Sequence, residues 1–219
     1  MTKKKPQRIY FLQTSSAGDA KRSALRTRRK TVREEHRYKE MAMSKYLSIT
    51  TLNVNGLNAP MKRHRIAEWI RKHDPHICCL HETYLRTKDL HRLKVNGWKQ
   101  IFQENGQEKK AGVAILISDK IDFQRGAITT DPEGHFIILK ERIHQEDINI
   151  VNTYAHNIGA PKYIKKILED FKKDIDSNTI IVGDFNTPLS KMDRSSKQNI
   201  NKDIVSLNNT LEEMDLTDI

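Results

Sequence analysis

Four apolar segments of this chain each run into polar side chains that can bind a metal ion or a phosphate. These side chains are Asn53, Glu82, Tyr154, Asp184 and Asn186, after the apolar segments 47–52, 76–80, 148–153 and 179–182. Residues two apart on an extended segment point the same way, so Asp184 and Asn186 can face one site while Phe185 turns into the core. Ligand sites in α/β sheets lie beyond the carboxyl ends of the strands. The pattern therefore predicts one site assembled from distant parts of the chain.

Each of these side chains also has a purely structural interpretation. Asp184 and Asn186 precede Thr-Pro in a sequence that favours a turn, and Asn53 can form a similar turn. Glu82 could cap the next turn, and Tyr154 could be a core residue with its hydroxyl group at the surface. Taken together, these alternatives require four strands to end in unrelated turns that all supply oxygen atoms.

The candidate ligands carry oxygen donors only, from carboxylates and carboxamides, which suits Mg²⁺ and not Zn²⁺. The sequence contains neither Gly-x-x-x-x-Gly-Lys nor Gly-x-Gly-x-x-Gly, and it also lacks Gly-x-Ser-x-Gly. These absences argue against a nucleotide-driven motor and a dehydrogenase. Metal-assisted cleavage of a phosphodiester is the reaction that these groups most naturally support.

The positive charge of the chain is concentrated near its N-terminus. The 219 residues include 39 Lys and Arg against 28 Asp and Glu, a net charge of +11. Residues 1–45 hold 14 basic and 4 acidic side chains, a net of +10, which leaves +1 for residues 46–219. We predict that residues 1–42 form a disordered basic appendage. Such a tail can bind nucleic acid nonspecifically or direct import into the nucleus, where we expect this protein.

The sequence contains no run of 18 apolar residues and no signal-peptide core, so we expect no contact with a membrane. Its two cysteines, Cys78 and Cys79, are adjacent, and neighbours on a strand point to opposite faces. We therefore expect buried thiols in a reducing compartment, not a disulfide or a zinc site.

Residues 43–219 have the pattern of one packed domain. We expect strands at 47–52, 76–80, 98–103, 112–118, 136–141, 148–153 and 179–182, and helices opened by Pro60 and Pro161 or capped by Asn201. The strands outnumber the helices and mostly form hairpins. This arrangement favours an α/β fold in which two packed sheets form a sandwich with helices outside.

The order of the motifs resembles that of the exonuclease III and apurinic endonuclease superfamily of endonucleases, exonucleases and phosphatases. The resemblance is carried by residues 52–57, 80–83, 152–155 and 182–188, and it extends from about residue 43 to residue 219. It is closest to the endonuclease domain that opens the second-frame protein of LINE retrotransposons. A phosphatase acting on a lipid or sugar phosphate is a weaker alternative within the same superfamily.

The resemblance implies an exonuclease III-like sandwich that nicks DNA with Mg²⁺. It implies Glu82, Asn53, Asp184 and Asn186 at the metal site. Asp184 would orient and activate the attacking water, with Asn186 positioning Asp184 and a phosphate oxygen. Tyr154 would donate to a phosphate oxygen as charge builds in the transition state. The implied DNA contacts are Arg194 and Asn157, and charge alone suggests phosphate contacts for Lys109 and Lys110.

The chain departs from the family's pattern in three places. His81 stands where the family usually has Gln, and His156 stands where it usually has Pro. The family completes its site with a late Asp and a His near its last strands, and this sequence reaches Ile219 before either. We therefore expect a truncated sandwich that lacks its last strands, with weak or absent activity, so that its status as an enzyme is open. The alternative is a catalytically dead remnant that at most binds nucleic acid nonspecifically through the basic tail.

Overall fold

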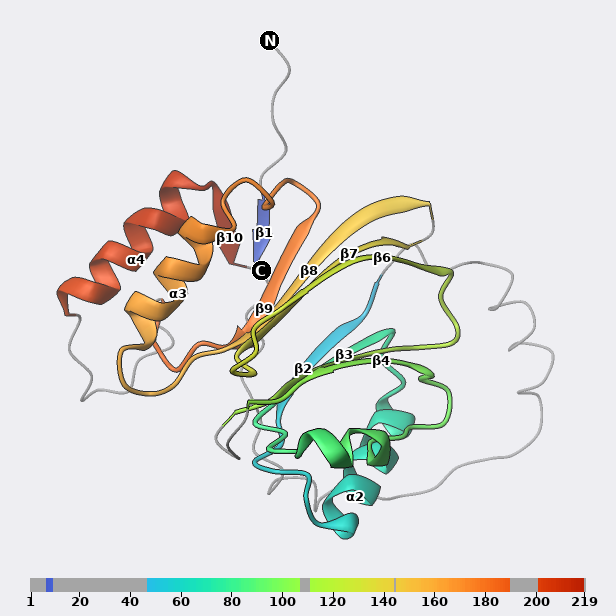
Figure 1. Ribbon diagram of the computed structural model, residues 1–219. Helices are drawn as coiled ribbons and strands as arrows, with labels where there is room; N and C mark the ends of the chain where they lie inside the picture. The colour runs from blue at the N-terminus through green and yellow to red at the C-terminus, as the bar shows by residue number, and fades with distance from the viewer. Residues whose placement is uncertain (1–6, 10–46, 107–110, 144, 190–200, 219) are drawn as a thin grey trace, which may run out of the picture.

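The computed structural model describes residues 7–9, 47–106, 111–143, 145–189 and 201–218 (Figure 1). The first half of the element order is β1 (Gln7–Ile9), β2 (Ile49–Asn53), α2 (Pro60–His73), β3 (Ile77–His81), the 3₁₀ helix η1 (Thr87–Arg92), β4 (Gln100–Glu104) and β5 (Val113–Ile117). The second half is β6 (Phe123–Thr130), β7 (Phe136–Ile143), β8 (Glu146–Tyr154), α3 (Ala160–Asp170), β9 (Thr179–Asp184), α4 (Lys202–Glu213) and β10 (Leu216–Asp218).

These strands form two sheets that pack face to face (Figure 1). The first sheet has the strand order β10-β1-β9-β8-β7-β6, and the second has the order β2-β3-β5-β4. The core between them takes alternate residues of the interior strands, including Ile115 and Ile117 from the second sheet and Ile137 and Leu139 from the first. The predicted two-sheet α/β sandwich with helices outside is confirmed.

The helices cover the outer faces of the two sheets. Helices α3 and α4 pack on the first sheet, where Ile164, Leu168 and Leu207 join one apolar cluster. Helix α2 packs on the second sheet through Ile70. Two start signals act as predicted: proline opens α2 and α3, and the Asn201 side chain accepts a hydrogen bond of 2.9 Å from the Ile204 amide at the start of α4.

Strand β3 is an interior strand of the second sheet, as its apolar sequence predicted. All five of its residues are buried, and it pairs with β2 in parallel and with β5 in antiparallel orientation. The predicted hairpins β4–β5 and β7–β8 are also present. Strand β6 was not predicted, because a register shift between Gln124 and Ala127 interrupts its alternation and most of its residues are exposed.

The N-terminal segment contributes a strand to the first sheet. Gln7–Ile9 form β1, which lies between β9 and β10 and runs parallel to both. The prediction of disorder is therefore wrong for these three residues, because their backbone groups pair with two neighbouring strands. The rest of the predicted appendage lies outside the described residues.

Across the part of the chain that the structure describes, no helix has both the length and the apolar character needed to cross a membrane.

The position of β3 predicts that its thiols are unreactive in the folded chain. Cys78 and Cys79 are free and fully buried, and burial raises the pKa of Cys78 to about 12 and raises that of Cys79. Since the thiolate is the reactive form, we expect no reaction with Ellman's reagent at pH 8 until guanidinium unfolds the chain. Rapid labelling of either thiol under native conditions would contradict a buried β3.

Candidate active site

The predicted site residues come from four strand ends, two in each sheet. Asn53 ends β2 and Glu82 follows β3 in the second sheet, whereas Tyr154 ends β8 and Asp184 ends β9 in the first. Both strand pairs are parallel, with Asn53 opposite His81 and Tyr154 opposite Asp184. The carboxyl ends of each pair therefore meet at one edge of its sheet.

A hydrogen bond across the sandwich joins the two edges. The Asn53 amide nitrogen Nδ2 donates to Asp184 Oδ2 at 2.8 Å. The same side chains also form turns, since Asn53 Oδ1 accepts from the Asn55 amide at 3.0 Å and Asp184 Oδ1 from the Asn186 amide at 3.3 Å. The turn interpretation is therefore confirmed for these two residues, and the same hydrogen bonds leave their side chains beside each other at the candidate site.

Glu82 is held at the site by its backbone and by a neighbouring hydroxyl group. Its φ of 54° lies in the left-handed region, which is uncommon for this residue type, and its carbonyl accepts from the Gly56 amide at 2.7 Å. Its carboxylate accepts from the Tyr84 hydroxyl group at 2.6 Å, so this side chain is bound by a tyrosine and not committed to capping a turn.

The charge state of Glu82 suits a cation ligand. Burial alone would raise the pKa of its carboxyl group. Hydrogen bonds from three side chains lower that pKa, and so does the electrostatic interaction with His81; the three donors are Tyr84, Asn53 and Tyr154. Together these interactions outweigh the effect of burial. The net pKa lies below its ordinary value, so Glu82 is ionised at neutral pH.

The hydroxyl group of Tyr154 remains a hydrogen-bond donor at neutral pH. Burial raises the pKa of Tyr154 to about 12, and the negative charges of Glu82 and Asp184 act in the same direction. The pKa of Tyr84 is also raised, first by burial and then by its hydrogen bond with Glu82. Two neutral hydroxyl groups therefore lie beside the carboxylates. Sequence reasoning missed Tyr84, because it lies in the loop after β3 and not at a strand end.

A buried polar pair connects the sheets directly behind the site, and sequence reasoning missed one partner, Asn152. The His81 Nε2 proton is donated to Asn152 Oδ1 at 2.6 Å, and the Asn152 side-chain nitrogen Nδ2 donates to the Ala114 carbonyl at 3.1 Å. Burial lowers the pKa of His81, which keeps the imidazole neutral beside Glu82. The available signal was a polar residue inside an apolar strand, two positions before Tyr154 and hence on the same face.

The remaining predicted site residues occupy the rim or lie outside the described residues. Asn186 is exposed, has a φ of 44° and donates from Nδ2 to the Ala155 carbonyl at 2.7 Å, which ties together the loops after β8 and β9. Asn157 is exposed in the loop between β8 and α3. The predicted DNA contacts Arg194, Lys109 and Lys110 lie outside the described residues.

The donor set fits Mg²⁺. Among the described residues no cluster of three or more His, Cys, Asp or Glu side chains is arranged to hold a metal ion. The site instead offers the carboxylates of Glu82 and Asp184 with the Asn53 carboxamide, and His81 is committed to Asn152. Mg²⁺ prefers oxygen donors and takes one or two carboxylates, with water and substrate phosphate completing its shell.

Comparisons with known proteins agree with this architecture. The model of the Endonuclease/Exonuclease/phosphatase family matches residues 50–215. The chain is 29% identical over 153 residues to the transposon TX1 uncharacterized 149 kDa protein of Xenopus laevis, covering 68% of this chain and 12% of that protein. It is also 29% identical over 153 residues to the DNA repair nuclease APEX1 of Danio rerio, covering 65% of this chain and 46% of that protein. The chain thus spans less than half the length of these relatives.

Solved structures share the fold. An AP endonuclease from Archaeoglobus fulgidus superposes with a TM-score of 0.55 at 23% identity, over 77% of this chain and 71% of that one. TDP2 of Caenorhabditis elegans superposes with a TM-score of 0.51 at 18% identity, over 68% of this chain and 65% of that one. At these identities the likeness establishes the two-sheet architecture.

The polar pair behind the site predicts a stability effect. We expect Asn152→Ala to lower the free energy of unfolding by about 1–3 kcal/mol, because it leaves the buried His81 Nε2 proton without an acceptor. Urea denaturation measures the change. As a matched control, Asn209→Ala on the exposed face of α4 should stay within about 0.5 kcal/mol of the original chain. Equal effects of the two substitutions would show that the pair does not stabilise the sandwich.

Proposed function

Because this chain belongs to the Endonuclease/Exonuclease/phosphatase family, we propose that its site hydrolyses phosphodiester bonds of DNA with Mg²⁺ as cofactor. The superfamily predicted from the order of the motifs is confirmed by the family match and by the transposon and repair-nuclease relatives. The observation that carries the proposal is the hydrogen bond from Asn53 to Asp184, since it brings strand ends of both sheets to one place.

Two carboxylates divide the work in this proposal. Glu82 is ionised and, with Asn53, would hold Mg²⁺. When bound, Mg²⁺ supplies positive charge to the phosphate oxygens and so lowers the cost of the charge that develops on them. Asp184 accepts the proton of the attacking water and fixes its direction of approach. Asn53 restrains Asp184 Oδ2, which orients that carboxylate.

The side chains of the first sheet act on the phosphate. Tyr154 is protonated and donates a hydrogen bond to a non-bridging oxygen as charge builds in the transition state. The Asn186 side chain donates a hydrogen bond to the Ala155 carbonyl and so holds the loop after β9 against the loop after β8. This contact positions Asp184 relative to Tyr154. These roles need no covalent intermediate on the protein.

DNA is the proposed substrate because the relatives include a transposon protein and a protein named as a DNA repair nuclease. Asn157 is exposed on the loop that follows Tyr154, where it can contact the nucleic acid backbone. We further propose that Arg194, Lys109 and Lys110 contact phosphates and that the protein acts in the nucleus. The expected low activity, and the alternative of a catalytically dead nucleic-acid-binding remnant, stay predictions that the following assay decides.

The assay is nicking of supercoiled plasmid by purified chain with Mg²⁺ or with EDTA. We expect nicking only with Mg²⁺, and we expect Glu82→Gln and Asp184→Asn each to reduce the rate by roughly 10²-fold or more. The first substitution removes a cation ligand and the second removes the base. Glu68→Gln, on the exposed face of α2, is the matched control and should retain the original rate.

Either of two results would overturn this proposal. Nicking that persists in both Glu82→Gln and Asp184→Asn would mean that the activity comes from another site or a contaminant. No nicking by a soluble chain that unfolds cooperatively would favour the catalytically dead remnant.

A second prediction concerns Tyr154 and pH. We expect Tyr154→Phe to reduce kcat by roughly 10²–10³-fold, because it removes one hydrogen bond to the developing charge. The pKa of Tyr154 is raised to about 12, so its hydroxyl group stays protonated at every pH well below that value. The ratio of the original rate to the Tyr154→Phe rate should therefore be constant from pH 7 to pH 10. A ratio that falls across this range would show that Tyr154 ionises within it.

A further inference from the structure

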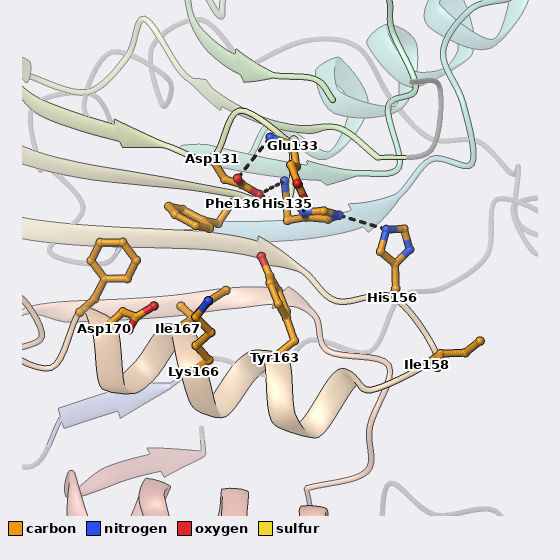
Figure 2. Close-up of a pocket in the computed structure, with 11 residues that line it drawn as sticks. Asp131, Glu133, His135, Phe136, His156, Ile158, Tyr163, Lys166, Ile167 and Asp170 are labelled. Atoms are coloured by element: carbon orange, nitrogen blue, oxygen red, sulfur yellow. Dashed lines mark hydrogen bonds and ion pairs between the residues drawn. The ribbon is translucent and has the colours of Figure 1, made fainter. Parts of the chain in front are cut away.

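Two histidines that the proposed reaction does not use face each other beside the end of β8 (Figure 2). His135 lies at the turn between β6 and β7, and His156 lies two residues beyond Tyr154. Their Nε2 atoms are 3.0 Å apart, and their rings meet edge to face with centroids 4.9 Å apart. The two rings therefore come from two different loops, and each directs its Nε2 atom toward the space between them.

Asp131 fixes the orientation of the first histidine. Its Oδ2 accepts from His135 Nδ1 at 2.9 Å and from the His135 amide at 3.2 Å, while its Oδ1 accepts from the Glu133 amide at 3.2 Å. The carboxylate is thus locked in its turn by three hydrogen bonds. A neutral His135 that donates from Nδ1 to Asp131 carries a lone pair on Nε2, and that lone pair points toward His156.

Two lone pairs cannot face each other at this distance without a positive centre between them. That centre is either a proton carried by one ring or a metal ion that both rings bind. Two nitrogens bound to one ion at roughly 2.1 Å lie about 3.0 Å apart in adjacent octahedral positions, and about 3.4 Å apart in tetrahedral ones. The carboxylate–histidine pair formed by Asp131 and His135 is the usual arrangement behind a histidine metal ligand.

We propose that His135 and His156 form a binding site for a transition-metal dication of the zinc class, separate from the oxygen-only site at Glu82. Imidazole nitrogen suits Zn²⁺, Ni²⁺ and Cu²⁺, whereas Mg²⁺ requires oxygen donors. The protein supplies two ligands, since the described residues contain no cluster of three, and water fills the remaining positions. This site does not depend on the proposed nuclease activity.

The surroundings leave room for those waters and hold the rings in place. The pair borders a pocket of about 450 Å³ that is also lined by Glu133, Tyr163, Lys166 and Asp170 (Figure 2). Lys166 opposes a bound cation, whereas the carboxylates of Asp131 and Glu133 favour it, since they lie 2.9 and 3.7 Å from His135 Nδ1. The edge of the His156 ring meets Tyr154 with centroids 5.2 Å apart, and His135 meets Tyr163 at 5.6 Å. Both ligands are therefore positioned before an ion arrives.

The test is isothermal titration of EDTA-treated, dialysed full chain with ZnCl₂, and separately with MgCl₂, at pH 7.5. We expect one saturable zinc site that Mg²⁺ does not displace. His156→Ala should abolish it, and His156 is exposed, so this substitution leaves the core intact. Asp131→Asn should weaken zinc binding by roughly 10–100-fold, because it removes the carboxylate that orients His135.

The matched control is His64→Ala, which removes an exposed histidine on α2 and should leave zinc binding unchanged. Saturating Zn²⁺ should also raise the melting temperature of the original chain and not that of His156→Ala, since an ion that binds only the folded state stabilises it. Absence of saturable zinc binding would overturn the proposal, as would zinc affinity that is equal in the original chain and His156→Ala. Loss of affinity in His64→Ala as large as that in His156→Ala would likewise overturn it.

Discussion

The arrangement of the candidate site depends on the buried hydrogen bond between His81 of β3 and Asn152 of β8. It crosses the apolar core between the sheets, one residue before Glu82 and two residues before Tyr154. An unpaired polar group at this depth carries a desolvation cost of about 1–3 kcal/mol, so each partner holds the other in place. Sliding one sheet over the other would separate the pair and would also separate the strand ends that carry the candidate catalytic groups.

The residues that form turns at the strand ends are also residues of the candidate site, and several of them have unusual backbone conformations. Glu82, Tyr84 and Asn186 all have positive φ values, and the loops that contain them are held by hydrogen bonds to neighbouring loops. Residues in this region are strained by about 1–3 kcal/mol unless the surroundings enforce the conformation. Here the enforcement comes from the parallel pairing of β2 with β3 and of β8 with β9, which continues past the strand ends.

The polar groups at this edge of the sandwich form two regions, which differ in the atoms that can donate an electron pair. Around Glu82 the groups are carboxylates, a carboxamide and protonated tyrosine hydroxyl groups, and the one nearby imidazole is buried and neutral. Around His156 the groups are imidazole nitrogens oriented by Asp131. Tyr154 lies between them, with its ring against His156 and its hydroxyl group near Glu82. The two regions therefore offer oxygen donors and nitrogen donors at separate places on one surface.

The sequence by itself determined the sandwich, its interior strand β3, the start signals of its helices and the four strand ends of the candidate site, because apolar alternation and turn residues are local signals. It did not determine β6, whose bulge breaks the alternation, or β1, which is a strand only because β9 and β10 flank it. Only the tertiary structure decided that Asn152 pairs with His81, that Tyr84 holds Glu82 and that Asp131 orients His135 toward His156. The contact between His81 and Asn152 joins strands of the two sheets, and the contact between His135 and His156 joins two loops. All of these contacts depend on side-chain direction in space, which spacing along a chain does not encode.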